Sequence, residues 1–279
     1  MQKRLTFACF LLLCVASQLS AQPLTALTYN IRYATESDGA DAWSKRRDFL
    51  AAQLRFHKPD VFGVQEALKP QLDYLLEQLP EYSYVGAGRD DGREGGEYSA
   101  LFYRTDRFRA LESGTFWLSE TPDKPSKAWD AALPRICTWA LLEDTASGQK
   151  LRVFNTHFDH IGQVARQNSA ALILKKTTEM NSGGEPVIVM GDLNSEPGAG
   201  PVALLSESLR DAHDHSLEPP FGPEGTFNGF KFHEPVSRRI DYIFVSPTLR
   251  VLQYAVLSDS RDCHYPSDHL PVLARMVFE

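Results

Sequence analysis

Short strand-like apolar runs recur along almost the whole chain, and they constrain its fold more than any other feature. They cover residues 24–31, 61–65, 82–85, 99–103, 108–117, 135–142, 151–158, 186–190, 239–245, 249–257 and 270–278. Short connections separate most of the runs between residues 82 and 158, which is typical of hairpins and antiparallel pairing. We therefore expect a chain built mainly from β-sheet.

Three helical patterns interrupt the strands. Residues 44–56 and 72–79 each carry an apolar face that ends at a proline, Pro59 and Pro80, and residues 164–180 form the third pattern. Strands with few helices, spread evenly along the chain, predict an α/β (α+β) fold. In this fold two mixed, largely antiparallel sheets pack face to face and the helices lie outside them.

The first 21 residues have the pattern of an export signal. Lys3 and Arg4 precede an apolar run at residues 5–15, and Ala21 is a small residue at the expected cleavage point. The run is shorter than the roughly 20 apolar residues of a membrane-spanning helix. We expect an exported protein, periplasmic or secreted, without a transmembrane segment, in which residues 22–279 form a single domain.

The net charge of the chain limits the kinds of molecule that it can bind. Without Lys3 and Arg4, the 29 basic residues fall to 27 against 36 acidic ones, so the net charge moves from -7 to -9. Tight, non-specific binding of nucleic acid depends on Lys and Arg side chains that release phosphate counterions. The acidic chain argues against such binding, whereas a small phosphoester substrate remains compatible with it.

The sequence leaves two properties open. Cys137 and Cys263 are the cysteines that follow the predicted signal, and an exported protein permits a disulfide between them without requiring one. The oligomeric state is also undetermined, and a monomer is the default expectation.

Polar residues that follow apolar strands are the first candidates for a functional site. Glu66 follows the buried run at residues 61–65, where its carboxylate can bind a hard cation such as Mg²⁺, although a surface glutamate at the start of a helix gives the same pattern. Asn30, at the end of the first strand, offers an amide oxygen as a ligand or a clamp on Glu66. Taken alone, it fits a turn residue better.

Asp192 and Asn194 follow the β-branched strand at residues 186–190 and lie two positions apart, so both side chains face the same way in an extended chain. An ionised Asp192 can orient or deprotonate a water molecule, and the Asn194 amide can hydrogen-bond a phosphoryl oxygen. A simple turn is the alternative. The position directly after a buried strand favours the functional interpretation.

Histidines complete the set of candidates. A protonated His157, at the end of the strand at 151–158, would be a cationic donor to a phosphate, whereas a neutral histidine at a strand edge is the alternative. Asp241 and His269 form a candidate dyad in which the carboxylate fixes the imidazole tautomer and favours its protonated form. Asp268 points the other way and is available to a metal.

Six segments carry a resemblance to a known family. They are Thr28-Tyr29-Asn30-Ile31-Arg32, Gln65-Glu66, Asn155-Thr156-His157, Gly191-Asp192-Leu193-Asn194, Arg239-Ile240-Asp241-Tyr242-Ile243 and Ser267-Asp268-His269-Leu270-Pro271. Their order and spacing resemble the endonuclease/exonuclease/phosphatase superfamily, the group similar to deoxyribonuclease I. The segment from Gly114 to Trp139 resembles an exported bacterial branch of that group.

The resemblance implies a four-layer sandwich and a phosphoester hydrolase that uses Mg²⁺, with Mn²⁺ as a substitute. It further implies roles for the matching residues. Glu66, Asn30 and Asp268 would form the metal site, Asp192 would align or activate the water, Asn194 and His157 would hold the scissile phosphate, and Asp241 with His269 would stabilise the transition state or act as base.

One departure from the family pattern bears on the substrate. Relatives that resemble apurinic endonucleases carry an acid where this chain has Arg32, so repair of abasic DNA is disfavoured. Arg135, which begins a strand, is a candidate for binding the phosphate, and a structural arginine fits equally well. The loop at residues 119–134 is expected to form one wall of a cleft.

Three functions are consistent with these residues. The first is an exported phosphodiesterase or phosphatase that acts on a small or lipid-linked phosphoester, and the acidic charge favours it. The second is an extracellular nuclease, which would need a basic rim around the cleft. The third is a non-catalytic binding protein, which has no reason to retain every acid and histidine of the pattern.

Overall fold

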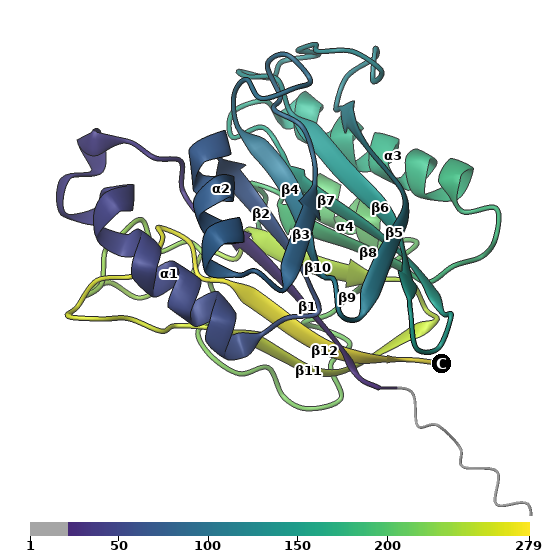
Figure 1. Ribbon diagram of the computed structural model, residues 1–279. Coiled ribbons are helices and arrows are strands. Elements are labelled where there is room, and N and C mark those ends of the chain that lie inside the picture. The colour runs from purple at the N-terminus through teal and green to yellow at the C-terminus, as the bar shows by residue number, and fades with distance from the viewer. Residues whose placement is uncertain (1–21) are drawn as a thin grey trace, which may run out of the picture.

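The computed structural model describes residues 22–279 and contains two six-stranded sheets (Figure 1). The predicted export signal lies outside the described residues. The first sheet has the order β11-β12-β1-β2-β4-β3 and the second the order β5-β6-β7-β8-β10-β9. Within the described chain, all neighbouring strands run antiparallel except β1 with β2 and β7 with β8.

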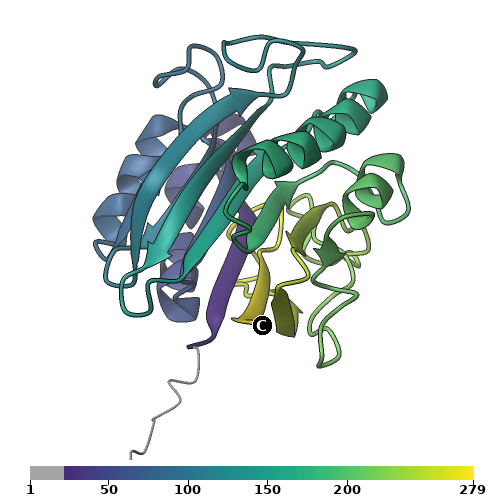
Figure 2. The same ribbon diagram turned by 90° about the vertical axis from the view of Figure 1, so that its right-hand side faces the viewer.

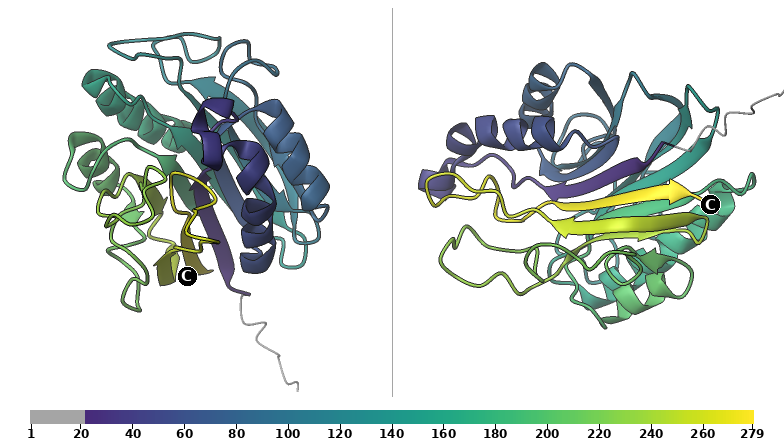
Figure 3. Two further views of the ribbon diagram at one scale, coloured as in Figure 1. Left: turned by 90° about the vertical axis from the view of Figure 1, so that its left-hand side faces the viewer. Right: turned by 90° about the horizontal axis from the view of Figure 1, so that it is seen from below.

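The strands are short and lie close to their predicted positions. The first sheet comprises β1 (Leu24–Asn30), β2 (Val61–Ala67), β3 (Tyr82–Val85), β4 (Tyr98–Arg104), β11 (Leu249–Val256) and β12 (Val272–Phe278). The second comprises β5 (Phe108–Trp117), β6 (Ile136–Asp144), β7 (Lys150–His157), β8 (Val187–Asp192), β9 (Arg210–Asp211) and β10 (Asp241–Val245). The first and last strands, β1 and β12, lie side by side (Figure 3).

Helices cover the outer faces of both sheets. Side chains of α1 (Trp43–His57) and α2 (Lys69–Gln78) pack on the first sheet, and those of α3 (Gln163–Met180) and α4 (Gly200–Ser206) pack on the second. Figures 1 and 2 show α1 and α2 on one side of the paired sheets and α3 on the other. The predicted α/β sandwich of two mixed sheets flanked by helices is therefore confirmed.

Side chains alternate along the strands between an inner core and the helix layers. In β1, Ala26 lies in the cluster between the sheets and Leu27 packs toward the helices. In β7, Val153 lies in the cluster between the sheets and Phe154 packs toward the helices. Strands that are buried on both faces have to be apolar at nearly every position, which explains the continuous runs in the sequence.

Strand directions bring several chain segments to one edge of the sandwich. The parallel pairs β1 with β2 and β7 with β8 end together, and His157 lies opposite Asp192 in the register. Strand β10 runs antiparallel to β8, so its first residue, Asp241, also lies opposite Asp192. Residues 267–269 precede β12, which is antiparallel to β1, and they reach the same edge.

Three short elements are not predicted from the sequence. They are a 3₁₀ helix, η1 (Glu36–Asp41), together with α4 and the two-residue strand β9. Each is too short to show a hydrophobic period. Both cysteines of the described chain are free: Cys137 is buried in β6, and Cys263 is exposed. Within residues 22–279, no helix combines the length and the apolar character needed to cross a membrane.

Asn155 of β7 connects the two sheets through its side chain. Its amide nitrogen donates to the carbonyls of Val64 at 3.0 Å and Ala100 at 2.8 Å, and its oxygen accepts from Gln65 Nε2 at 2.6 Å. A Cβ on Gly63 would lie 2.4 Å from the Asn155 amide, so glycine is required there for the close approach. The sheets are thus joined by hydrogen bonds as well as by apolar packing.

Replacing Asn155 with alanine is expected to lower the free energy of unfolding by about 3 kcal/mol or more, because it leaves several buried polar groups without partners. Urea denaturation followed by circular dichroism measures this loss. A loss below about 1 kcal/mol would mean that the amide contributes little, and it would contradict the proposed role.

Candidate active site

A cavity of about 480 Å³ opens at the edge where the strands of both sheets end. Most of the residues predicted from the sequence line it: Glu66, Arg135, His157, Asp192, Asn194, Asp268 and His269. Asn30 and Asp241 lie beneath the lining and are completely buried. Leu133 also lines the cavity, so the end of the loop at 119–134 contributes to its wall. The structure therefore brings together all nine predicted residues.

Glu66 reaches the cavity because β2 bulges at this point. The register with β4 shifts between Val64 and Ala67, and Glu66 has a left-handed φ of 62°. Its two carboxylate oxygens accept from Asn30 Nδ2 at 3.1 Å and from the Tyr33 backbone N–H at 3.2 Å. The nitrogen of Asn30, not its oxygen, faces Glu66. Asn30 therefore acts as a clamp on that carboxylate.

Asp192 lies at the centre of the site. Its carboxylate accepts from Asn30 Nδ2 at 3.0 Å and from the Asn194 backbone N–H at 2.8 Å. Burial, followed by the nearby charge of Asp241, raises the pKa of Asp192 to about 7. Gly191 precedes it with a φ of 144°, and a Cβ there would lie 1.9 Å from the Thr156 carbonyl oxygen. The glycine is required for strand packing.

Asp241 and His269 form the predicted contact. His269 Nδ1 donates to Asp241 Oδ2 at 2.8 Å, and its Nε2 lies 3.7 Å from Asp192 Oδ2. Burial by itself would lower the pKa of His269, but the charge and hydrogen bond of Asp241, with further help from Asp192 and Asp268, raise it to about 10. His269 is consequently an imidazolium at neutral pH, and it presents Nε2–H toward Asp192.

Thr226 supports this pair from a loop in which the sequence shows no pattern. Its hydroxyl donates to Asp241 Oδ2 at 2.6 Å and accepts from the backbone N–H groups of Ile240 and Asp241 at 3.0 and 3.1 Å. Thr226 is completely buried. It is therefore a positioning residue that fixes the orientation of the Asp241 carboxylate.

Replacing Thr226 with valine is expected to lower kcat about tenfold, since one hydrogen bond to a charged group is worth roughly 1.5–3 kcal/mol. Replacing it with serine retains the hydroxyl and should restore most of the activity. Steady-state kinetics of both variants measure the difference. Equal activity of the valine and serine variants would show that the hydroxyl has no role.

The interpretation of His157 as a cation is not supported by its surroundings. Burial is the largest cause that lowers its pKa well below the ordinary value, and the positive charge of Arg135 is the next. Asn194 Nδ2 lies 3.1 Å from His157 Nε2 and also donates to the Phe158 carbonyl at 3.1 Å. A neutral His157 therefore accepts a hydrogen bond from Asn194 and orients its amide.

Arg135 and Asp268 both line the cavity, and they bring opposite charges to it. Arg135 precedes β6, is 6% exposed, and contacts Asp159 at 3.4 Å and His160 Nδ1 at 3.0 Å. Asp268 is half-buried, and burial raises the pKa of its carboxyl, with a further contribution from the charge of Glu66. Arg135 thus supplies positive charge, and Asp268 adds a second carboxylate near Glu66.

The donor set fits a divalent cation. Carboxylate oxygens are the preferred ligands of Mg²⁺, and Glu66 and Asp268 bring two carboxylates to one cavity. Ligand atoms of Asp192, Asp241 and His269 also lie within 4.8 Å of one another, and the buried Asp241 Oδ1 has no hydrogen-bond partner among the described residues. Both groups are therefore candidates for holding a cation, and Glu66 and Asp268 are the carboxylates that are not engaged with His269.

Three residues of the site are missed by the sequence analysis. Thr226 and Arg238 lie in the long connection between β9 and β10, where the sequence has no apolar period. Glu97 lines the cavity and pairs with Arg89 at 2.6 Å behind Arg135. These residues reach the site only through the tertiary fold, and their spacing in the chain gives no signal of it.

The fold and this arrangement of acids, amides and histidines define a hydrolase of phosphoester bonds. The chain belongs to the Endonuclease/Exonuclease/phosphatase family, whose model matches residues 27–269. This membership confirms the predicted family, and the sheets and helices match those of its solved members.

Two structures from Bacteroides thetaiotaomicron are similar over nearly the whole chain. A protein described as an endonuclease/exonuclease/phosphatase family protein is 41% identical, covers 93% of this chain and 99% of its own, and has a TM-score of 0.89. A protein named mannosyl-6-phosphatase is 42% identical, covers 91% of this chain and 100% of its own, and has a TM-score of 0.87.

More distant relatives have other described functions. A CCR4-Not complex 3'-5'-exoribonuclease subunit from the fungus Coccidioides immitis is 23% identical over 90% of this chain. The match spans 46% of that relative, so this chain corresponds to about half of its length.

Proposed function

We propose that this protein is an exported, Mg²⁺-dependent phosphatase that acts on small phosphate esters, with sugar phosphates as the preferred class. The observation that carries the proposal is the convergence in one cavity of the carboxylates Glu66 and Asp268 with the cationic side chains of Arg135 and His269. Carboxylates suit a cation, and cationic donors suit the oxygens of a phosphate.

In this proposal, Glu66 and Asp268 hold the cation, and Asn30 fixes the orientation of Glu66. When bound, the cation supplies positive charge to a phosphoryl oxygen. The phosphoryl group rests against Asn194 and His157, which are hydrogen-bonded to each other at 3.1 Å.

Asp192 is placed to accept a proton from a water molecule whose oxygen forms a bond to phosphorus. The bond between phosphorus and the ester oxygen breaks, and its electron pair stays on the leaving oxygen, which takes a proton from a second water molecule. The hydroxide that remains takes the proton from Asp192, and this restores the carboxylate. His269, held by Asp241 at 2.8 Å, donates Nε2–H to the phosphoryl group as charge develops. Arg135, which lines the same cavity, adds positive charge.

Two observations support a small substrate over a long nucleic acid. The relative named mannosyl-6-phosphatase is 42% identical over 91% of the chain. The arginines that line the cavity are each paired with an acid: Arg32 with Asp38 at 3.0 Å, Arg135 with Asp159 at 3.4 Å and Arg238 with Glu196 at 3.4 Å. Paired guanidinium groups make a poor basic rim, and a nuclease needs one.

A substrate panel tests the proposal. With Mg²⁺, the purified protein is expected to release phosphate from p-nitrophenyl phosphate and from mannose 6-phosphate, and to act slowly on bis-p-nitrophenyl phosphate and on single-stranded DNA or RNA. Preferential cleavage of the nucleic acids would establish the nuclease alternative. The absence of turnover on every phosphoester would favour the non-catalytic binding protein.

A further inference from the structure

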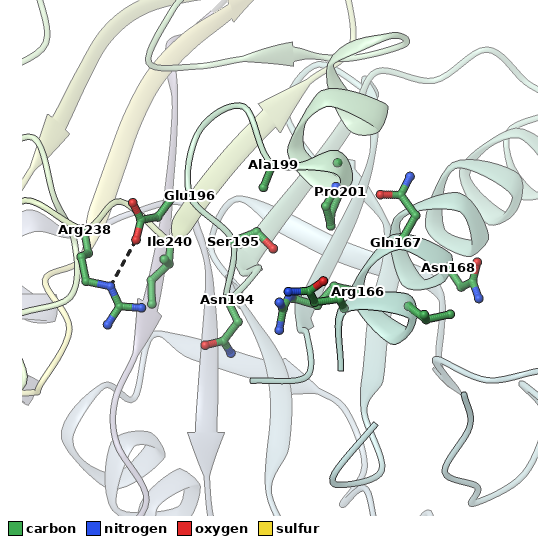
Figure 4. A pocket seen from close by; sticks show the side chains of 13 residues that line it. Arg166, Gln167, Asn168, Asn194, Ser195, Glu196, Ala199, Pro201, Arg238 and Ile240 are labelled. Carbon is green, nitrogen blue, oxygen red and sulfur yellow. Dashed lines mark hydrogen bonds and ion pairs between the residues drawn. The ribbon is translucent and has the colours of Figure 1, made fainter. Parts of the chain in front are cut away.

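A second cavity adjoins the first and is larger, with a volume of about 630 Å³ against about 480 Å³. It lies between the start of α3, the loop at 194–199 and the start of α4 (Figure 4). The two cavities share Asn194, Arg238 and Ile240 in their linings. A molecule whose phosphate lies in the catalytic cavity can therefore extend past Asn194 into the second one.

Ser195 marks this second cavity as a binding site. Its side chain lines the cavity, the residue is 5% exposed, and its Oγ has no hydrogen-bond partner among the described residues. Figure 4 shows Ser195 between the Glu196–Arg238 pair on one side and Gln167 on the other. An unpaired buried hydroxyl costs roughly 1–3 kcal/mol, and rotation of this side chain toward a ligand hydroxyl in the cavity would remove that cost.

The remaining walls offer neutral hydrogen-bonding groups. Gln167 of α3 reaches across Gly200 of α4, where a Cβ would lie 2.3 Å from Gln167 Oε1. Asn168 lines the same wall, and Glu196 contacts Arg238 at 3.4 Å, so these two charges offset each other. Arg166 also lines the cavity, and its guanidinium donates to the carbonyl of Asp159 at 3.0 Å. The cavity thus presents hydroxyl and amide groups together with the positive charge of Arg166.

The same lining excludes other ligand classes. None of the 13 side chains that line the cavity within the described chain is aromatic, whereas binding of single-stranded nucleic acid relies on aromatic rings that stack on the bases. A lipid chain would need a mainly apolar wall, whereas eight of the 13 lining residues carry amide, hydroxyl or charged side chains. Hydroxyl-rich ligands match the lining best.

We propose that this second cavity is the subsite for the neutral, hydroxyl-rich alcohol portion of the substrate, a sugar or a short chain of sugars. Ser195 and Gln167 bind its hydroxyl groups, and Asn194 lies at the junction between sugar and phosphate. The inference rests on the proposed phosphatase function and adds the residues that select the substrate.

The test compares how two substitutions change the selectivity for a sugar over an aryl group. In Ser195→Ala and Gln167→Leu, the ratio of kcat/KM for mannose 6-phosphate to kcat/KM for p-nitrophenyl phosphate is expected to fall about tenfold, mainly through KM. Lys175→Leu, on an exposed part of the same helix, should leave the ratio unchanged. Ser195→Ala should not lower the Tm, because its buried hydroxyl has no partner among the described residues and its removal relieves the cost of burying it.

An unchanged ratio in both variants would overturn the subsite. If the wild-type protein hydrolyses neither substrate, the proposed function fails, and saturation-transfer NMR with methyl α-mannoside then decides the inference independently. A signal that Ser195→Ala and Gln167→Leu weaken would retain a sugar site at this cavity, and the absence of a signal from the wild type would overturn it.

Discussion

Replacing His269 with alanine is expected to lower kcat about 100- to 1,000-fold, the range observed when a donor to a developing negative charge is removed. His269 is 4% exposed, is held by Asp241 at 2.8 Å, and lies 3.7 Å from Asp192. Kinetics with p-nitrophenyl phosphate measure the change, and near-UV circular dichroism checks the fold. His264→Ala, at an exposed histidine outside the cavity, is the control.

A double-mutant cycle separates catalysis from structure. If Asp241 acts by holding His269, Asp241→Asn should lower kcat in the wild-type background and have little further effect in His269→Ala. Additive losses would mean that the two residues act independently. Full activity of a folded His269→Ala variant would eliminate the proposed mechanism.

Replacing Glu66 with glutamine is expected to raise the Mg²⁺ concentration needed for half-maximal rate by about 100-fold, since loss of even an indirect partner of a metal costs about 10- to 100-fold in affinity. The neutral side chain has nearly the same size and can keep one of the two native hydrogen bonds, from Asn30 at 3.1 Å or from the Tyr33 N–H at 3.2 Å, so the change in cavity shape should be small. Titration of the rate with Mg²⁺ measures the shift.

Two further measurements test the role of Glu66 in binding the cation. Removal of divalent cations with EDTA should abolish turnover, and added Mg²⁺ should restore it. Glu179→Gln, at an exposed glutamate of α3, should leave the Mg²⁺ requirement unchanged. Turnover that persists in EDTA, or a Glu66→Gln variant with the native Mg²⁺ requirement, would contradict the assignment of Glu66.

The sequence predicts the regular parts of this fold well for a physical reason. Strands buried on both faces must be apolar at nearly every position, so β8 and β10 contain the continuous apolar runs Val187-Ile188-Val189-Met190 and Tyr242-Ile243-Phe244-Val245. The residues at the ends of those strands are equally visible, because an Asp or Glu that follows such a run contrasts with it. In the same way, the runs at 24–31 and 61–65 indicate Asn30 and Glu66.

The remaining features depend on contacts that the spacing of residues does not encode. Thr226 reaches Asp241 from a loop without a regular period, and α4 is only seven residues long. The charge state of His157 depends on its burial and on Arg135, which comes from another strand. The hydrogen bond from Asn30 to Glu66 requires a bulge in β2, and no residue type in the sequence indicates that bulge.

The hydrogen bonds of the catalytic centre cross from one sheet to the other. Asn30 of β1 binds Asp192 of β8 at 3.0 Å, and His269, just before β12, binds Asp241 of β10 at 2.8 Å. The relative position of the two sheets thus sets the distance between Glu66, which would hold a cation, and Asp192, which would take the proton of the attacking water. The rate of turnover should therefore depend on how the two sheets are positioned against each other. A substitution in the core between the sheets, far from the cavity, should slow catalysis at temperatures where the protein is still folded.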